Sequence, residues 1–248
     1  MVPPGNAEFL ELWERGHRMH PLDRALLVIQ ASLPMSSEKQ SASSIADWPL
    51  GRRNRALAQA RTLYFGPTLE GWTVCPQCGE KLEFELDCRA IGESPETMSE
   101  DCISAQGGSF RPVTSRDLAL VAGESDCERA ALVLIKNCTL EPSTGGSESE
   151  MEVWPPEAVE EIASKMAEAD PLAEISLGFD CPICRHTSQE VLDLGSFLWT
   201  EIEARARQLL SEVHALAAAY GWAEAAILGM SDVRRAAYLG MGQRMVHV

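Results

Sequence analysis

The chain has 248 residues, of which 45% are hydrophobic and 23% are charged. These proportions are those of a globular protein with one sizeable core or two small domains, and they exclude disorder throughout the chain. A formal net charge of −16 at pH 7 excludes a general affinity for nucleic acid or anionic membranes, since both are polyanions, and it favours protein partners.

The segment MVPPGNAEFLELWERG at the N-terminus has neither a basic start nor an apolar signal core. No run of the sequence approaches the roughly 18 apolar residues needed to span a bilayer. We therefore expect a cytoplasmic protein with no membrane span. In that compartment, eight cysteines that include two Cys-x-x-Cys pairs indicate metal binding or redox chemistry rather than structural disulfides.

Apolar residues recur at helical spacing between Phe9 and Phe65, which predicts three helices in an N-terminal helical region over residues 1–70. The polar segment 35–47 is predicted to be a loop between the second and third of these helices. Gly66 is expected to end the third helix in a left-handed conformation.

The segment 72–88, WTVCPQCGEKLEFELDC, holds a Cys-Pro-x-Cys knuckle followed by alternating apolar and polar residues from Lys81 onward. This alternation predicts a half-buried strand, and we expect its partner strand to lie far away in the sequence. A second Cys-Pro-x-Cys knuckle, with a strand predicted on each side, lies within residues 174–194. Together, 71–90 and 174–194 are predicted to form one split zinc ribbon.

Residues 91–173 are expected to be a helical insertion with loops. Its first part, 91–110, is a loop by composition. Two short helices follow, in VTSRDLALVAG and SDCERAALVLIKNC, and Ser125 with Glu128 predicts a capping box at the start of the second. A linker over 139–156 then precedes an acidic helix, PEAVEEIASKMAEAD, which we expect to be exposed.

Residues 195–248 are predicted to form a C-terminal helical region. An apolar seam at three-four spacing indicates a long helix from about Gly195 to Tyr220, which Gly221 terminates. We interpret the seam as core. Two short helices follow, the second capped by Ser231. The predicted fold class is therefore mainly α with a small β zinc-ribbon module, an α+β arrangement.

Zn²⁺ favours four ligands in a tetrahedron, and a knuckle turn aims two thiolates at one ion. Cys75 and Cys78 of the first knuckle, with Cys181 and Cys184 of the second, therefore predict one four-cysteine zinc site. About 100 residues separate the halves instead of the usual 15 to 20 or so, but closing a longer loop costs only roughly 0.6 kcal/mol per doubling of its length. A closed site of four thiolates leaves no coordination position for water or substrate, so the metal is expected to be structural.

Alternatives to this site stay open at the level of sequence. The two pairs could be buried thiols or a redox disulfide, the first knuckle could bind metal together with Cys88 and Cys102, or His186 could replace one thiolate. The four cysteines outside the knuckles are more simply ordinary small residues or buried thiols: Cys88, Cys102, Cys127 and Cys138. We expect Cys127 and Cys138 to take part in helix packing.

The sequence has no Gly-x-Ser-x-Gly elbow, no phosphate-binding Gly-rich loop and no His-Glu-x-x-His helix, so a non-enzymatic protein is expected. His17 and His20 are interpreted as a surface connection between helices rather than a metal site. Four arginines gather on the third helix, and we expect them to pair with the chain's own carboxylates in preference to forming a partner site: Arg52, Arg53, Arg55 and Arg61.

The segment GSFLWTEIEARARQLLSEVHALAAAYGWAEAAILGMSDVRRAAYLGMG resembles a protein family encoded with phage tails and phage-like contractile injection systems, described as similar to T4-type baseplate proteins. HPLDRALLVIQASLP, WPLGRRNRALAQAR and the two CP-x-C knuckles also fit the longer, zinc-bearing members of that family. The resemblance brings no catalytic residues. It implies a part in building the baseplate or central hub, as a component or an assembly chaperone, with other baseplate or hub proteins as partners.

Two other classes of protein compete with this expectation. One is a zinc-ribbon transcriptional or regulatory protein-binding module, although a ribbon that reads DNA should be basic. The first knuckle is crowded by acidic residues instead: Glu80, Glu83, Glu85 and Asp87. The other class is an enzyme with a redox Cys-x-x-Cys, which thiol titration in the absence of metal would favour.

Overall fold

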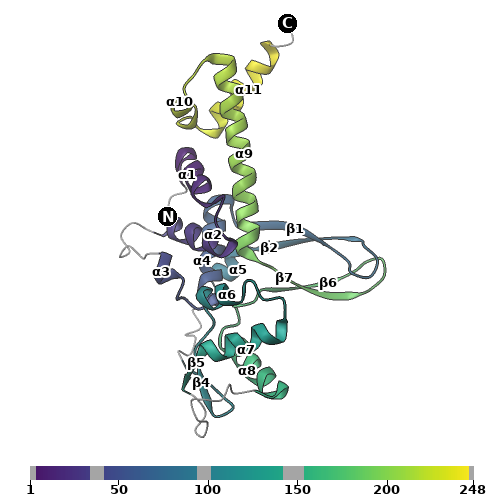
Figure 1. The fold of residues 1–248 in the computed structure, drawn as a ribbon. Helices are drawn as coiled ribbons and strands as arrows, with labels where there is room; N and C mark the ends of the chain where they lie inside the picture. The colour runs from purple at the N-terminus through teal and green to yellow at the C-terminus, as the bar shows by residue number, and fades with distance from the viewer. Residues whose placement is uncertain (1–3, 34–41, 94–101, 142–153, 246–248) are drawn as a thin grey trace.

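The structure, a computed structural model, describes residues 4–33, 42–93, 102–141 and 154–245. It confirms the predicted fold class, since helices dominate and the strands form small antiparallel sheets. Figure 1 shows an elongated molecule built along one long helix, α9 (Leu194–Tyr220), with two β hairpins extending sideways from near its start. The helices before residue 93 are α1 (Asn6–Gly16), α2 (Pro21–Ser32), α3 (Ala42–Ile45), α4 (Leu50–Phe65) and α5 (Cys88–Gly92).

The main hydrophobic core lies where α1, α2 and α4 pack against α9. Close packing of α1 requires Gly16, because a Cβ added there would lie 2.3 Å from the ring of Trp199. The structure adds a fourth element to the three predicted helices. The short helix α3 occupies part of the predicted loop 35–47 and buries Ile45, whereas residues 35–41 of that loop lie outside the described part of the chain.

The long helix α9 runs where the apolar seam predicts it. It begins at Leu194, one residue before the expected start, and ends at Tyr220, where Gly221 adopts the left-handed conformation with φ 68°. Asp193 caps the first turn by accepting the Ser196 N–H at 3.1 Å. The apolar seam of α9 belongs to the core, as predicted, since five of its residues are buried: Trp199, Ile202, Ala206, Leu209 and Leu216.

Two further helices follow α9: α10 (Glu224–Leu228) and α11 (Asp232–Met245). Helix α11 is longer than the predicted short helix, and Ser231 caps it as expected, its Oγ accepting the Arg234 N–H at 3.4 Å. Arg235 ties α11 back to α9. Its side chain is 1% exposed, and its Nε donates to the Glu212 carboxylate at 2.9 Å.

The insertion between the hairpins has a second, smaller core. Its elements are β3 (Ile103–Ala105), β4 (Gly108–Phe110), α6 (Ser115–Val121), α7 (Cys127–Cys138), β5 (Thr139–Glu141) and α8 (Pro156–Ala169). The predicted loop 91–110 therefore contains two strands, which are too short to give an alternation pattern. The predicted linker 139–156 begins with a third strand of the same sheet, and its residues 142–153 lie outside the described part. Helix α8 is not fully exposed as expected, because Ala158 and Ile162 are buried.

The start of α7 also differs from the prediction by one residue. Asp126 caps the helix in place of Ser125, because its carboxylate accepts the N–H groups of both Glu128, at 3.0 Å, and Arg129, at 3.2 Å. The Ser125 N–H donates instead to the carboxylate of Glu124.

A buried carboxylate, Asp117, links α6 to its surroundings. Its oxygens accept two hydrogen bonds from Arg111, at 2.6 and 2.8 Å, two from Thr114, and one from Asn137. Burial alone raises the pKa of this carboxyl, but the hydrogen bonds donated by Arg111 and Thr114 outweigh it and lower the pKa to about 2. Asp117 is therefore ionised in the folded protein at neutral pH.

Candidate metal centre

Two β hairpins form what we call the arm: β1 (Thr68–Val74) with β2 (Lys81–Asp87), and β6 (Ser176–Asp180) with β7 (Thr187–Val191). Each Cys-Pro-x-Cys knuckle is the turn between two antiparallel strands. This corrects one expectation, because β2 pairs with the strand just before it, with Thr68 opposite Asp87, and not with a distant one. The sequence hides β1 because Gly71 and the exposed Trp72 interrupt its apolar alternation. The hairpins are separate two-stranded sheets that extend side by side (Figure 1).

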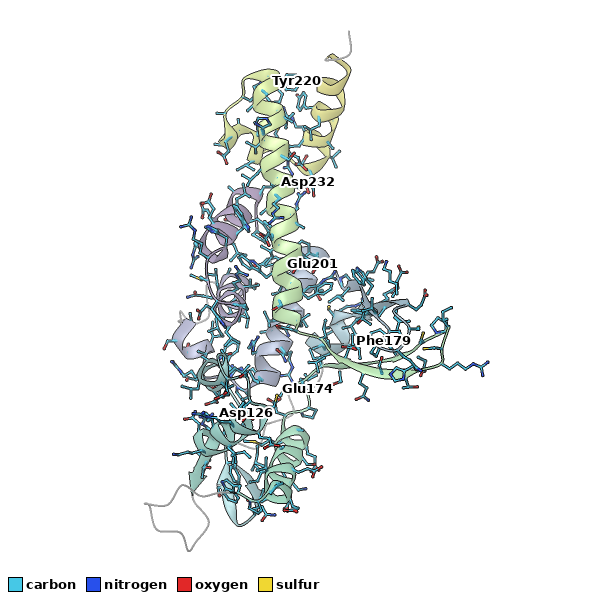
Figure 2. All side chains as sticks on the ribbon, turned by 45° about the vertical axis from the view of Figure 1, so that its right-hand side comes forward. Asp126, Glu174, Phe179, Glu201, Tyr220 and Asp232 are labelled. Carbon is cyan, nitrogen blue, oxygen red and sulfur yellow. The ribbon has the colours of Figure 1, made fainter. Side chains whose placement is uncertain are left out.

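The two hairpins pack on each other through a small apolar core. Leu82 of the first and Phe179 of the second are buried in it, and the rings of Phe84 and Phe179 meet edge to face at 5.7 Å. The Phe84 ring lies across Gly71, where an added Cβ would come within 2.5 Å of it. In Figure 2, Phe179 lies within the arm, away from Glu201 on α9.

The two knuckles share one backbone turn. In the first, the Cys75 carbonyl accepts the Gly79 N–H at 2.9 Å, and in the second the Cys181 carbonyl accepts the Arg185 N–H at 2.9 Å. The donor in each turn stands four positions after the first cysteine and has a positive φ, 77° at Gly79 and 60° at Arg185. Only glycine adopts this conformation without steric cost. The same turn therefore presents two sulfurs from each hairpin.

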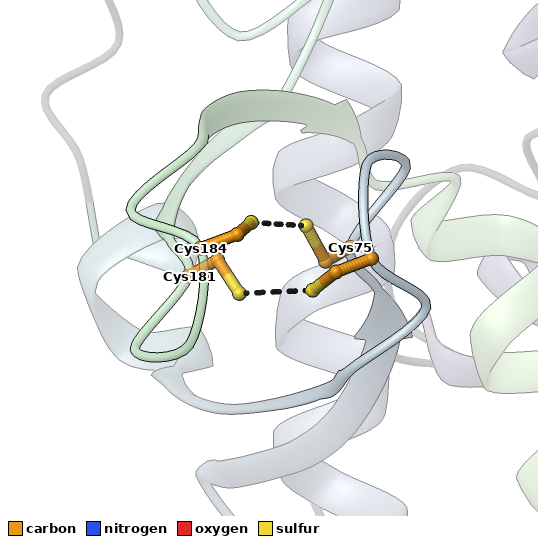
Figure 3. A group of neighbouring side chains, drawn as sticks. Cys75, Cys181 and Cys184 are labelled. Carbon is orange, nitrogen blue, oxygen red and sulfur yellow. Dashed lines mark hydrogen bonds between the residues drawn. The ribbon is translucent and has the colours of Figure 1, made fainter.

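The four knuckle sulfurs converge on one point (Figure 3). Cys75 Sγ lies 3.6 Å from Cys184 Sγ, Cys78 Sγ lies 3.5 Å from Cys181 Sγ, and all four atoms lie within 4.8 Å of one another. Four sulfurs about 2.3 Å from a central zinc would be about 3.8 Å apart, whereas a disulfide requires about 2.05 Å. The geometry therefore fits a tetrahedral metal centre and not a disulfide. His186 contributes its backbone carbonyl, which accepts the Cys181 N–H at 2.9 Å.

Hydrogen bonds, desolvation and neighbouring thiols shift the pKa values of two thiols in this cluster in opposite directions. Backbone N–H groups of Cys184 and Ile183 donate to the Cys181 sulfur and lower its pKa to about 7. At Cys78, the Glu80 N–H acts in the same direction, but desolvation and the neighbouring thiols outweigh it and raise the pKa to about 12. One thiolate forms readily, and its charge then opposes the next. A divalent cation would remove this repulsion, so metal binding at this cluster would be coupled to loss of the thiol protons.

The remaining cysteines lie outside the cluster. Cys88 is buried in the main core and Cys102 is exposed, and the structure does not bring them to the first knuckle. Cys138 is buried, and this burial, together with the charge of Asp117, raises the pKa of its thiol to about 11. Cys127 was expected in helix packing but is exposed, because it is the first residue of α7.

The two histidines of the first helical connection have local roles. His17 Nδ1 lies 2.7 Å from the Glu14 carbonyl oxygen, and its ring packs on Trp13. His20 caps α2 by accepting the Leu22 N–H on its Nδ1. Among the described residues, neither belongs to a group of side chains placed to hold a metal ion.

Two of the four arginines of α4, Arg53 and Arg61, are buried. Arg61 is buried and donates to the Glu201 carboxylate at 2.9 and 3.2 Å, which confirms pairing with the chain's own carboxylates at this position. Arg53 is also buried, and desolvation lowers the pKa of its guanidinium. Arg52 lies instead over the ring of Trp48, 4.2 Å from its centroid.

Helix α4 also holds the base of the arm. Arg61 Nη1 donates to the Gly66 carbonyl at 2.6 Å, two residues before β1. Asn54 Nδ2 donates to the carbonyls of Leu172, at 2.8 Å, and Ala173, at 3.1 Å, just before β6. One helix thus positions both hairpins. Asn54 was not among the predicted residues, because a polar residue on a helix carries no sign of a partner more than a hundred positions away.

The chain matches no protein-family model, no curated protein and no solved structure. Within the described residues, no helix is both long and apolar enough to cross a membrane.

Proposed function

We propose that the cluster binds one structural Zn²⁺ and that the protein acts by binding other proteins, as a component or an assembly chaperone of the baseplate or hub of a contractile tail-like particle. One observation carries the first part. Two hairpins that are about 100 residues apart in the sequence bring four sulfurs within 4.8 Å of one another, close enough to bind one ion. The ligands are Cys75, Cys78, Cys181 and Cys184.

Zinc is favoured over other metals by the donor set. Four thiolates are soft ligands that select zinc, copper(I) or iron–sulfur chemistry, and a compact tetrahedron built by two knuckle turns is the usual environment of a structural zinc ion. With all four positions taken by sulfur, such an ion stabilises the fold and activates no water. Its role would be to lock the two hairpins into one arm.

The baseplate or hub role rests on the resemblance of the C-terminal segment, which corresponds to α9, α10 and α11. An elongated body with a projecting arm suits a protein that joins others. The acidic side chains on the first hairpin disfavour the competing interpretation as a nucleic-acid-binding ribbon, because a polyanion would be repelled: Glu70, Glu83, Glu85 and Asp87.

The metal is tested by elemental analysis of the purified protein. We expect about one zinc per chain, lost in Cys181→Ser together with thermal stability, and retained in Cys102→Ser, which removes an exposed thiol outside the cluster. Iron or copper in place of zinc would refute the choice of metal. Full metal content in Cys181→Ser would refute the shared site.

The biological role is tested separately, by deleting the gene in a host that makes contractile particles. Electron microscopy should then find particles with incomplete or absent baseplates, and the wild-type gene should restore them. Normal contractile particles in the deletion strain would refute an essential assembly role. A pull-down that recovers RNA polymerase instead of tail proteins would favour the zinc-ribbon regulator.

A further inference from the structure

The outer face of the β1–β2 hairpin exposes a tryptophan. Strand alternation sends Leu82 and Phe84 toward the second hairpin, and it sends Trp72 and Val74 to the opposite side. Trp72 is 62% exposed and Val74 is 50% exposed. Figures 1 and 2 show the arm extending away from the helices, with the second hairpin along one side of the first. The tryptophan therefore lies on a sheet face that no described element covers.

Carboxylates surround this tryptophan at fixed register positions. Trp72 lies opposite Glu83 in the antiparallel pair, and the next outward-facing pair places Glu70 directly opposite Glu85. Like charges opposite each other destabilise a sheet, and no ion pair within the described part of the chain involves Glu70 or Glu85. A cation from outside the chain would relieve this repulsion.

The chain itself demonstrates that the ring accepts a cation. Lys81 Nζ lies 5.5 Å from the Trp72 ring centroid and 2.8 Å from a Glu83 carboxylate oxygen. Lys81 thus occupies the ring and one carboxylate and leaves Glu70 and Glu85 unneutralised. A guanidinium suits such a surface better than an ammonium, because it is planar, stacks on an indole and donates to a carboxylate through two N–H groups.

The geometry points to the outer face of the β1–β2 hairpin as a docking surface for an arginine-bearing segment of a partner protein. The partner's arginine stacks on Trp72 and pairs with Glu70 and Glu85, while an apolar neighbour covers Val74. In naming this chemistry we rely on the protein-binding role proposed above. The carboxylates around Trp72 attract a basic partner and repel nucleic acid.

The test uses the full chain and two synthetic peptides, acetyl-Gly-Arg-Gly-Arg-Gly-amide and its lysine counterpart. The chain has six tryptophans, and ¹H–¹⁵N spectra resolve one indole signal for each, with Trp72→Phe identifying the signal of Trp72. We expect a saturable shift of this signal with the arginine peptide, with an affinity about threefold higher than for the lysine peptide. An unmoved Trp72 signal would overturn the proposal.

Matched variants distinguish peptide binding at this face from attraction by the overall negative charge of the chain. Glu70→Gln with Glu85→Gln should weaken the binding at least about threefold, whereas Glu157→Gln with Glu160→Gln, the same charge change on exposed positions of α8, should not. Equal weakening by both pairs would refute a specific surface. The indole signals other than that of Trp72 report whether each variant is folded.

Removing the internal competitor should have the opposite effect. Lys81→Met frees the ring and Glu83, so the arginine peptide should bind about twofold more tightly. Lys165→Met is the matched control, since Lys165 makes a comparable exposed ion pair with Glu168. Weaker binding to Lys81→Met would contradict the stacking. Zinc content, measured on the same samples, shows whether the metal centre is intact, so a defect of this surface is distinguishable from loss of the metal. The gene deletion described above tests the protein-binding role independently of this surface.

Discussion

The two knuckle turns predict opposite effects for two substitutions at equivalent positions. Gly79→Ala should weaken the metal centre and Arg185→Gly should strengthen it, because both positions have a positive φ that only glycine adopts without cost. At Gly79 an added Cβ would meet no atom within 4 Å, so the substitution perturbs the backbone alone.

The expected magnitude is the difference between two effects. A left-handed backbone costs an L-residue roughly 1–2 kcal/mol, and the greater freedom of glycine in the unfolded chain offsets about 0.4–1 kcal/mol of this. The net change in the free energy of unfolding is about 0.7 kcal/mol, destabilising for Gly79→Ala and stabilising for Arg185→Gly. If the arm binds zinc as proposed, its folding is coupled to metal binding, and this free-energy difference corresponds to about a threefold change in zinc affinity.

Competition with a chromophoric chelator at pH 7 measures the zinc affinity of each variant. Gly123→Ala serves as the control, because it adds the same methyl group in open space at a position where φ is not positive. Weaker zinc binding in both knuckle variants would contradict the strain assigned to the positive φ. Zinc binding by Gly79→Ala as tight as that of the Gly123→Ala control would contradict it equally.

Three predictions concern the body of the protein. Asp117→Asn should lose about 2.5 kcal/mol of stability at neutral pH. The lowered pKa of Asp117, about 2 in the folded state, means that this contribution is complete above pH ~4 and is lost as the pH falls toward 2, so the difference in urea midpoint between variant and wild type should shrink over that range. Arg235→Met should cost about 3 kcal/mol, because it leaves the largely buried Glu212 carboxylate without its main partner; a thermal midpoint unchanged from wild type would contradict this. Gly16→Ala should lower the free energy of unfolding by about 2 kcal/mol, since its Cβ would clash with the ring of Trp199 on α9. A urea midpoint equal to that of the wild type would show that α1 and α9 accommodate the methyl group without loss.

The features that follow from local chemistry were predictable from the sequence. The seam of α9 has one period over many turns, and a left-handed Gly221 ends it, so the helix was located to within one residue. The paired Cys-Pro-x-Cys motifs identified the four sulfurs that converge, because each knuckle is a local turn.

Features that depend on contacts between distant segments were not predictable in the same way. Strand β1 was missed because its outward position 72 carries an exposed tryptophan, which breaks the expected alternation of apolar and polar residues. The three-residue strands of the insertion have no period to detect, and they form because Phe110 and Ile162 share a core. The role of Asn54 at the base of the arm is likewise a tertiary contact.

The wide spacing of the two knuckles also sets an order of events during synthesis. Cys75 and Cys78 leave the ribosome about 100 residues before Cys181, which is roughly 5 to 20 s at usual rates of elongation. Until then the first hairpin is an isolated pair of strands, marginally stable in water, with two thiols and no further ligand. The whole insertion must therefore be translated before the two hairpins can meet. In that interval the insertion can fold around its own small core. A metal bound by all four cysteines would mark the completion of the first 184 residues.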